Sequence, residues 1–247
     1  MANIVDERGY NQIFKSSRAQ AIRVRRRAEA MVQAMRLPEA PDERKGIHIM
    51  EIGCGMGELA HHLVRLTGAR VTGVDLSPKF IEQARVAHRL PQLDFQVMDI
   101  FALPPAAPDQ RYDFIVGNGI LHHLYHGLDH VLARLQEWLV PGGRLIFWEP
   151  NLHNPYVYLI FSFPRLRRLA RLEPGEMAFT RNFIATKLAR TGYTDIVVAR
   201  RDFLLPNTPG PFIRPAIALG QLIERVPPLA GVAPSLFIQA VRPPEPK

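Results

Sequence analysis

Cysteine is almost absent from this chain of 247 residues, because Cys54 is its single cysteine. One cysteine excludes an intramolecular disulfide and a cysteine-based zinc cluster, and it agrees with a reducing compartment. Long apolar runs are also missing, since residues 157–163, VYLIFSF, fall far short of the roughly 20 residues that span a bilayer. The first ten residues carry charges where a secretory segment needs an apolar stretch. We therefore expect a cytoplasmic protein.

Acidic residues are outnumbered, with 23 Asp and Glu against 31 Lys and Arg and a net charge of +8. Arginines cluster from Arg18 to Arg27 and from Arg165 to Arg171. Such clusters are typical of the solvated faces of amphipathic helices, and they also suit nucleic acid or an anionic membrane surface. Charge alone names no partner, so weak contact with an anionic membrane stays open. The length fits one domain with a continuous core.

A glycine-rich turn is the most informative feature of the chain. Glu51 ends a short apolar run, and the alternate glycines Gly53, Gly55 and Gly57 follow it. Where a strand turns into a helix, glycine permits positive φ and lets a ligand lie against bare backbone. Asp75 ends the next strand-like run, 18 residues beyond Gly57. This is about the spacing at which a doubly wound fold places a carboxylate for a ribose, so the pattern predicts a nucleoside site.

The glycine pattern also discriminates between nucleosides. A dinucleotide site requires G-x-G-x-x-G, whose last glycine helps to seat the pyrophosphate. Here the sixth position from Gly53 is Glu58, which would repel a pyrophosphate. Residues 51–57 instead resemble the first motif of the class I S-adenosylmethionine (SAM)-dependent methyltransferases, E/D-x-G-x-G-x-G, at every fixed position. Further marks follow in that family's order: Asp75-Leu76-Ser77-Pro78, the strand-like runs that end at Asp99 and Asn118, and Val140-Pro141-Gly142-Gly143 before an apolar strand. Within this family, the sequence resembles the branch that methylates small molecules, which includes the UbiE-like members.

The order of strands and helices predicts an α/β fold. Strand-like and helical segments alternate from residue 48 to residue 118, which implies a parallel sheet. The resemblance implies a Rossmann-like doubly wound sheet of seven strands in the order 3-2-1-4-5-7-6, with the last strand antiparallel and helical lid insertions. We expect a single domain over 1–247, made of an N-terminal helical lid (1–45), a SAM-binding core (46–150), and lid or acceptor-pocket insertions (151–179 and 204–232).

The resemblance also implies the roles of individual residues. Asp75 is expected to bind both ribose hydroxyls, because the two oxygens of a carboxylate accept hydrogen bonds at once. Leu76 and Ile100 are expected to flank the adenine, and Asp99 either accepts from its amine or caps a turn. The complete set of expected cofactor-binding residues is Tyr10, Glu51, Gly53, Cys54, Gly55, Gly57, Asp75, Leu76, Asp99, Ile100 and Asn118. The expected cofactor is SAM, and its product is S-adenosylhomocysteine (SAH).

Methyl transfer from SAM is an in-line displacement from an activated donor. Positioning can supply roughly 7–11 kcal/mol, which exceeds the contribution of a general base at about 10²–10⁴-fold. His122 and His123 follow the fourth predicted strand and are the candidates for a base. Adjacent histidines point in different directions, so we expect at most one to face the acceptor. No further histidine or carboxylate stands at a recognisable ligand spacing, and no metal is expected.

The acceptor is predicted from the residues just after the fourth strand. Asn118 is succeeded by Gly119-Ile120-Leu121, whereas enzymes that methylate adenine or glutamine nitrogens have Asn-Pro-Pro-aromatic there, so we expect no DNA substrate. Aromatic residues in the lid segments favour a small, largely apolar acceptor in bacterial-type biosynthesis, with oxygen as the expected methylated atom. Two alternatives stay open, a peripheral-membrane lipid or quinone methyltransferase and a non-catalytic SAM-binding partner or sensor. Both a monomer and a homodimer are compatible with the sequence.

Overall fold

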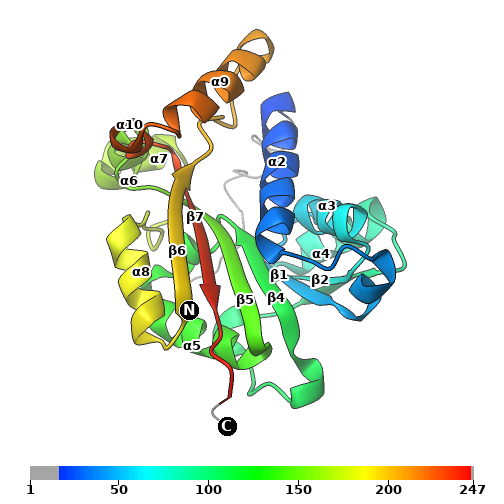
Figure 1. Ribbon diagram of the computed structural model, residues 1–247. Helices are drawn as coiled ribbons and strands as arrows, with labels where there is room; N and C mark the ends of the chain where they lie inside the picture. Colours follow the sequence, from blue (N-terminus) through cyan, green and yellow to red (C-terminus); the bar gives the residue numbers. More distant parts are fainter. Residues whose placement is uncertain (1–16, 246–247) are drawn as a thin grey trace.

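The sheet has the predicted order. The computed structural model describes residues 17–245, and within them seven strands form one sheet in the order β3-β2-β1-β4-β5-β7-β6 (Figure 1). The strands are β1 His48–Ile52, β2 Arg70–Asp75, β3 Leu93–Val97, β4 Tyr112–Asn118, β5 Leu139–Pro150, β6 Thr194–Arg201 and β7 Ser235–Val241. Strands β1 to β5 pair in parallel, whereas β7 runs antiparallel to both β5 and β6. The predicted order and antiparallel last strand are therefore confirmed.

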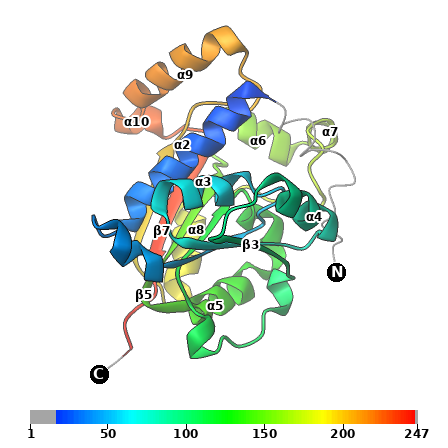
Figure 2. The ribbon, with the colours of Figure 1, turned by 90° about the vertical axis from the view of Figure 1, so that its right-hand side faces the viewer.

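Helices cover both faces of the sheet and create a core on each. Helices α2 (Arg18–Met35), α3 (Glu58–Thr67) and α4 (Pro78–Ala87) pack with one face, and α5 (Leu128–Trp138) and α8 (Arg181–Arg190) with the other (Figures 1 and 2). Successive residues of β5 alternate between the two cores, as a strand with period two requires. The central strands are thus buried on both faces, which is typical of parallel sheets.

Local sequence signals explain where the helices begin. Ser17 caps α2, since its Oγ accepts a hydrogen bond from the Gln20 N–H at 3.0 Å. Thr180 is a residue type that favours the N-cap and predicts a helix start, and it caps α8 in the same way through the Phe183 N–H. The apolar residues of 127–139 recur with a period near 3.6 and predict one stripe, which α5 buries against the sheet. The sequence also predicts a first helix over residues 10–36, whose start lies outside the described residues.

Short helices gather at the carboxyl end of the parallel strands. Helices α6 (Pro155–Ser162) and α7 (Pro164–Leu169) follow β5, and α9 (Gly210–Ile223) and α10 (Pro227–Ala230) precede β7 (Figures 1 and 2). Four 3-10 segments complete the described chain: η1 Pro41–Gly46, η2 Ile100–Ala102, η3 Pro108–Gln110 and η4 Leu121–Gly127. The division into a core and lids at 1–45, 151–179 and 204–232 stays a prediction. Across residues 17–245, no helix combines the length and apolarity needed to cross a bilayer.

Candidate functional site

A cavity of about 510 Å³ opens at the carboxyl edge of the sheet. The loops after β1 to β5 contribute to its wall, together with α2, α6 and α7. Open α/β sheets bind ligands at this edge, and the volume lies within the range of small-molecule sites. The predicted residues that line it are Glu51, Gly53, Cys54, Gly55, Asp75, Leu76, Asp99, Ile100, Asn118, His122 and His123. Tyr10 lies outside the described residues.

The glycine loop adopts the conformation that its sequence suggests. Gly53, Gly55 and Gly57 have φ of +64°, +53° and +85°. A Cβ on Gly53 would lie 2.6 Å from the Ile120 Cδ1, so a larger residue would displace the Ile120 side chain at the cavity wall. Gly57 is not among the cavity-lining residues; it caps α3, and a Cβ there would lie 2.4 Å from the Phe95 ring. In this structure the missing side chain of Gly57 therefore lets the start of α3 pack closely against Phe95.

Asp75 is held by the backbone on both sides of its carboxylate. The Gly55 N–H donates to its Oδ2 and the Ser77 N–H to its Oδ1, each at 2.9 Å. The carboxylate therefore joins the glycine loop to the end of β2 in one fixed orientation. A carboxylate has about four acceptor positions in all, which is why this residue type suits the hydroxyls of a ribose.

Asp99 has a clear local role. Its Oδ1 accepts a hydrogen bond from the Phe101 N–H at 2.9 Å and so caps η2. The structure thus shows the turn-capping alternative. Contact between Asp99 and an adenine amine stays a prediction, and Asp99 lines the cavity beside the buried Ile100.

His122 is oriented by Glu149, which the sequence did not single out. The buried Glu149 lies at the end of β5, and its Oε2 is 2.8 Å from the His122 Nδ1. Its Oε1 accepts from the Ile120 and Leu121 N–H groups at 3.0 and 2.7 Å. A carboxylate can only accept, so the proton of a neutral His122 lies on Nδ1 and its Nε2 carries the lone pair.

The two histidines have opposite pKa shifts. Burial lowers the pKa of His122, but the hydrogen bond and charge of Glu149, with the charge of Glu176, outweigh it, so the pKa is raised above 6.5. Burial, followed by the neighbouring His122, lowers the pKa of His123 well below 6.5. At neutral pH His123 is therefore uncharged. His122 is the histidine whose pKa is raised by neighbouring carboxylates.

Both histidines line the cavity. We expected them to point in different directions; their ring centroids are 4.3 Å apart. The carboxylate of Glu176 lies beside the two histidines. It is placed there because the Met177 N–H donates to the His122 carbonyl, which holds the neighbouring Glu176 next to η4. The Glu176 Oε1 is 3.3 Å from the His123 Nδ1.

These contacts correct one argument made from the sequence. Ligand atoms of His122, His123 and Glu176 lie within 4.8 Å of one another, so this trio is able to hold a metal ion. The expectation of no metal stays a prediction, but it rested on ligand spacing along the sequence, and the structure adds a carboxylate that this spacing did not show. Sequence spacing could not show it, because Glu176 comes from the segment after α7, far along the chain.

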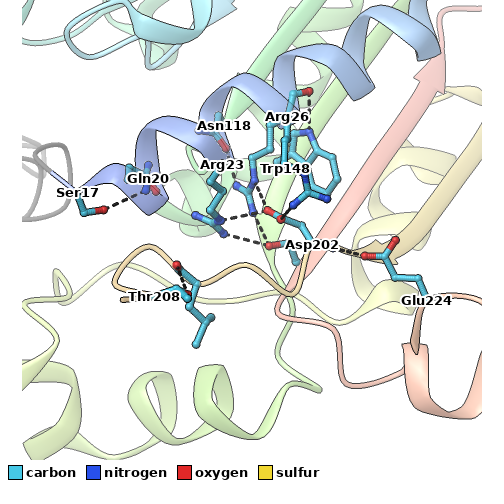
Figure 3. Close-up of polar contacts among 12 residues, drawn as sticks. Ser17, Gln20, Arg23, Arg26, Asn118, Trp148, Asp202, Thr208 and Glu224 are labelled. Carbon is cyan, nitrogen blue, oxygen red and sulfur yellow. Dashed lines mark hydrogen bonds and ion pairs between the residues drawn. The ribbon is translucent and has the colours of Figure 1, made fainter. Parts of the chain in front are cut away.

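An arginine cluster on α2 forms another part of the wall. Arg27, 4% exposed, donates from Nε to the Asp202 Oδ2 at 2.8 Å and from a terminal nitrogen to the Asn118 Oδ1 at 2.6 Å. Arg23 and Arg26 reach the same Asp202 at 3.1 and 3.4 Å (Figure 3). Arg23 and Arg27 line the cavity. The solvated face expected for this arginine run is therefore wrong for Arg27, although the run itself was a usable signal.

Charge and burial compete within this cluster. Burial and the charge of Arg23 lower the pKa of Arg27 to about 10, against the opposing charge of Asp202. Burial would raise the pKa of Asp202, but the arginines outweigh it and lower that pKa. Three guanidinium groups surround one carboxylate, and the cavity wall on the Asn118 side therefore favours an anionic ligand group.

Comparisons with known proteins agree with this geometry. Residues 49–143 match a family model described as a methyltransferase domain. The chain is similar to a trans-aconitate 2-methyltransferase of Paracidovorax citrulli, with 37% identity over 42% of this chain and 39% of the relative. It is also similar to a ubiquinone biosynthesis O-methyltransferase of Roseobacter denitrificans, with 31% identity over 49% of this chain and 48% of the relative. The matched part is less than half of each of these relatives.

Solved structures extend the similarity of fold to nearly the whole chain. A SAM-dependent methyltransferase from Archaeoglobus fulgidus superposes with a TM-score of 0.66 at 17% identity, over 96% of this chain and all of that one (100%). The plantazolicin methyltransferase in complex with SAH gives a TM-score of 0.66 at 16% identity, over 98% and 91% of the two chains. The matched family model and the sequence relatives, together with this fold, confirm the predicted resemblance to the class I SAM-dependent methyltransferases.

Proposed function

We propose, from the premise that residues 49–143 match a family model described as a methyltransferase domain, that this protein methylates an oxygen of a small, largely apolar acceptor with SAM. One observation carries the proposal: Asp75 is fixed by two backbone donors beside a loop whose Gly53 and Gly55, both at positive φ, line the cavity. This combination suits a nucleoside ribose next to bare backbone.

Different residues of the cavity would bind different parts of SAM. SAM, when bound, supplies a methyl group already activated as a sulfonium. Asp75 would accept from the ribose hydroxyls, and Leu76 and Ile100 would flank the adenine. At the other end, Arg23 and Arg27 offer cationic donors to the carboxylate of the methionine portion, an interaction that the sequence did not suggest.

The acceptor half centres on His122. Glu149 holds the proton of a neutral His122 on Nδ1, so that Nε2 can take the acceptor's hydroxyl proton as oxygen bonds to the methyl group. The proton would end on the His122 imidazole, and the bound donor would keep the carbon–sulfur electron pair and be left as the thioether SAH. Glu149 stabilises the resulting imidazolium by its charge, which agrees with the raised pKa of His122.

The wall contributed by the lid helices is apolar. Val157 and Phe161 of α6, with Leu172 after α7, line the cavity and are buried. Oxygen as the methylated atom is supported by the ubiquinone biosynthesis O-methyltransferase among the relatives, and by a base that suits a hydroxyl. We expect a small-molecule partner, no DNA, a cytoplasmic location, and a monomer or homodimer.

Transfer of label from SAM to a panel of hydroxylated apolar compounds tests this function. The His122→Ala variant is expected to lose about 10²–10⁴-fold in turnover, the contribution typical of a general base, whereas exposed His126→Ala is expected to retain it. Near-native turnover in both His122→Ala and His123→Ala would show that neither histidine takes the proton. Binding of SAM with no labelled product from any compound would instead favour a non-catalytic SAM-binding partner or sensor.

A second candidate is a peripheral-membrane methyltransferase that acts on a lipid or quinone. It is favoured by the exposed apolar side chains on the lid helices, among them Leu169 at 80% and Phe212 at 63% exposure. Lipid-soluble acceptors in the compound panel distinguish it from an enzyme restricted to water-soluble metabolites.

A further inference from the structure

Apolar side chains on the outside of the protein concentrate at one end. Within the described residues, most of the exposed large apolar side chains lie in 156–177 and 205–232. We define the apical face as the outward side of α6, α7, α9 and α10, marked by Leu159, Phe163, Leu169, Phe212, Leu222 and Leu229. Single exposed apolar residues are ordinary on a protein surface, whereas a concentration of them at one end marks an interaction site.

Both views place these four helices at the carboxyl end of the parallel strands (Figures 1 and 2). Side-chain amides hold the two helix pairs together, since Asn154 donates to the Val232 carbonyl at 2.6 Å and Asn151 to the Ala233 carbonyl at 2.7 Å. These hydrogen bonds link the start of α6 to the segment that follows α10, so both helix pairs are anchored at the carboxyl end of the sheet.

The helices of this end are apolar on two sides. On the inside, Val157 and Phe161 of α6 pack in one small cluster and Ile213 of α9 packs with α2 in another. On the outside, Leu159 of α6 and Phe212 of α9 are exposed. A helix at a soluble surface usually has a polar outer face. The outer side of these helices is thus built to contact something apolar.

Charge on the apical face indicates the nature of that contact. Residues 155–172 hold four arginines and no acidic residue. Arg167 uses its guanidinium to bind the carbonyls of Phe161, Glu173 and Glu176, whereas Arg165 and Arg168 are exposed. Arg214 and Arg225 of the other helix pair are also exposed. Arginine and aromatic side chains around an apolar surface suit the headgroup region of a bilayer that contains anionic lipids.

We propose that the apical face docks the protein on an anionic phospholipid bilayer. Leucine and aromatic side chains enter the interface, and the exposed arginines bind lipid phosphates. Residues 155–172, which include α6 and α7, carry arginines and no acidic residue, so this part of the apical face is complementary to a negatively charged surface.

With the apical face on the bilayer, the cavity wall formed by the lid helices lies next to the lipid. Tyr156 lines the cavity and is also 53% exposed, so the apical face and the cavity wall are continuous at this residue. A lipid-soluble acceptor could then pass from the bilayer to the site along apolar side chains. Delivery of the acceptor rests on the proposed function, but docking itself does not.

Flotation of the full chain with vesicles tests the docking. Phosphatidylcholine vesicles that contain phosphatidylglycerol are expected to carry the protein at low salt, and to lose it at high salt or without the anionic lipid. Each arginine near such a surface contributes about fivefold in partitioning, so Arg165→Gln with Arg168→Gln should weaken it roughly 25-fold. The matched control, Arg65→Gln with Arg190→Gln, removes two exposed charges from other helices and should leave partitioning unchanged.

Two further variants examine the apolar contribution. Leu169→Ser is expected to reduce partitioning, whereas Val86→Ser, at another exposed apolar position on α4, should have no effect. SAH binding by every variant, measured by calorimetry, confirms an intact fold and separates a failure of docking from a failure of the proposed function.

The docking proposal is overturned if anionic vesicles float no protein at low salt, or if the control pair weakens partitioning as much as the apical pair. It is also overturned if light scattering shows a dimer that Leu169→Ser dissociates, since a second copy would then cover this face.

Discussion

Gly53 is the residue at which backbone conformation and ligand binding meet most directly. Its φ of +64° is costly for other residues, and its missing side chain leaves room for the Ile120 side chain at the cavity wall. Asp75 and the carboxylate of Glu149 act alongside it, each fixed by backbone N–H donors. At this scale the site depends on groups held rigidly by main chain.

The Gly53→Ala variant is expected to bind SAH at least about tenfold more weakly than the native protein. A left-handed alanine costs about 1–2 kcal/mol, and its Cβ would also lie 2.6 Å from the Ile120 Cδ1. Gly142→Ala is the matched control, because its φ is +80° but no atom lies within 4 Å of the added Cβ. Calorimetry should show native affinity in the control. Equal affinity in the two variants would mean that the Gly53 loop does not hold the ligand.

The Glu149→Gln variant is expected to move the acidic limb of the pH–rate profile to lower pH. His122 must be neutral to accept a proton, so activity rises with pH through its pKa. Loss of the Glu149 charge removes the main cause that raises this pKa. The acidic limb of the profile therefore moves to lower pH. Turnover should fall as well, since the imidazolium loses its counter-charge. An unchanged acidic limb would show that another group titrates there.

The sequence predicted those site residues that are close together along the chain. Residues 51–57 and Asp75 follow a local pattern that one turn and one strand explain. Glu149, Glu176 and Asp202 could not be predicted, because each comes from a separate element and meets its partner only after the sheet is assembled. A carboxylate at a strand end has many possible partners until the register of the strands is known.

At the scale of elements, α2 is joined to β6 and β7 by charge as well as by packing. Asp202 follows β6, and it binds three arginines of α2 while its own N–H donates to Glu224 at 2.8 Å (Figure 3). Asp202 has a φ of +67°, which asparagine also tolerates. Replacement by asparagine therefore removes the charge without new backbone strain.

The Asp202→Asn variant is expected to lower the free energy of unfolding by about 3–5 kcal/mol, since it leaves the buried Arg27 without its counter-charge. Because folding lowers the pKa of Asp202, its stabilisation is present above the unfolded pKa near 3.8 and is lost as pH falls through the folded pKa. Urea unfolding at neutral pH measures the change. Glu29→Ala, which breaks an exposed pair with Arg25, is the control and should cost less than about 1 kcal/mol. Similar losses in both variants would argue against a structural role for the buried cluster.

Elements with clear periodicity or capping could be predicted with near-correct bounds. The stripe of α5 and the Thr180 cap of α8 are examples, because both signals are local. The short helices α6 and α7 and the 3-10 segment η4 were not predicted. Pro155 and Pro164 begin α6 and α7, but helices this short have little periodicity and depend on tertiary contacts.

At the scale of the whole molecule, the alternation of strands and helices indicated a parallel sheet and no more. The order 3-2-1-4-5-7-6 came from the resemblance to a known family, and the structure confirms it. Spacing cannot provide that order, because the position of a strand within a sheet depends on which faces the connecting helices cover.

Removal of metal from the whole protein is expected to leave methyl transfer unchanged. His122, His123 and Glu176 are near enough to hold an ion, but the proposed proton transfer uses the His122–Glu149 pair alone. Turnover after treatment with EDTA, with elemental analysis before and after, measures this. A loss of activity that zinc or magnesium restores would assign the trio to a metal instead.

Calorimetry with SAH, on the native protein and on Asp75→Ala, tests whether the glycine loop and Asp75 form a site for SAM, with NADH as the competing nucleotide. We expect SAH to bind in roughly the micromolar range, Asp75→Ala to bind it at least about tenfold more weakly, and NADH to give no heat. Heat from NADH, with none from SAM or SAH, would show that this site is built for a different nucleotide.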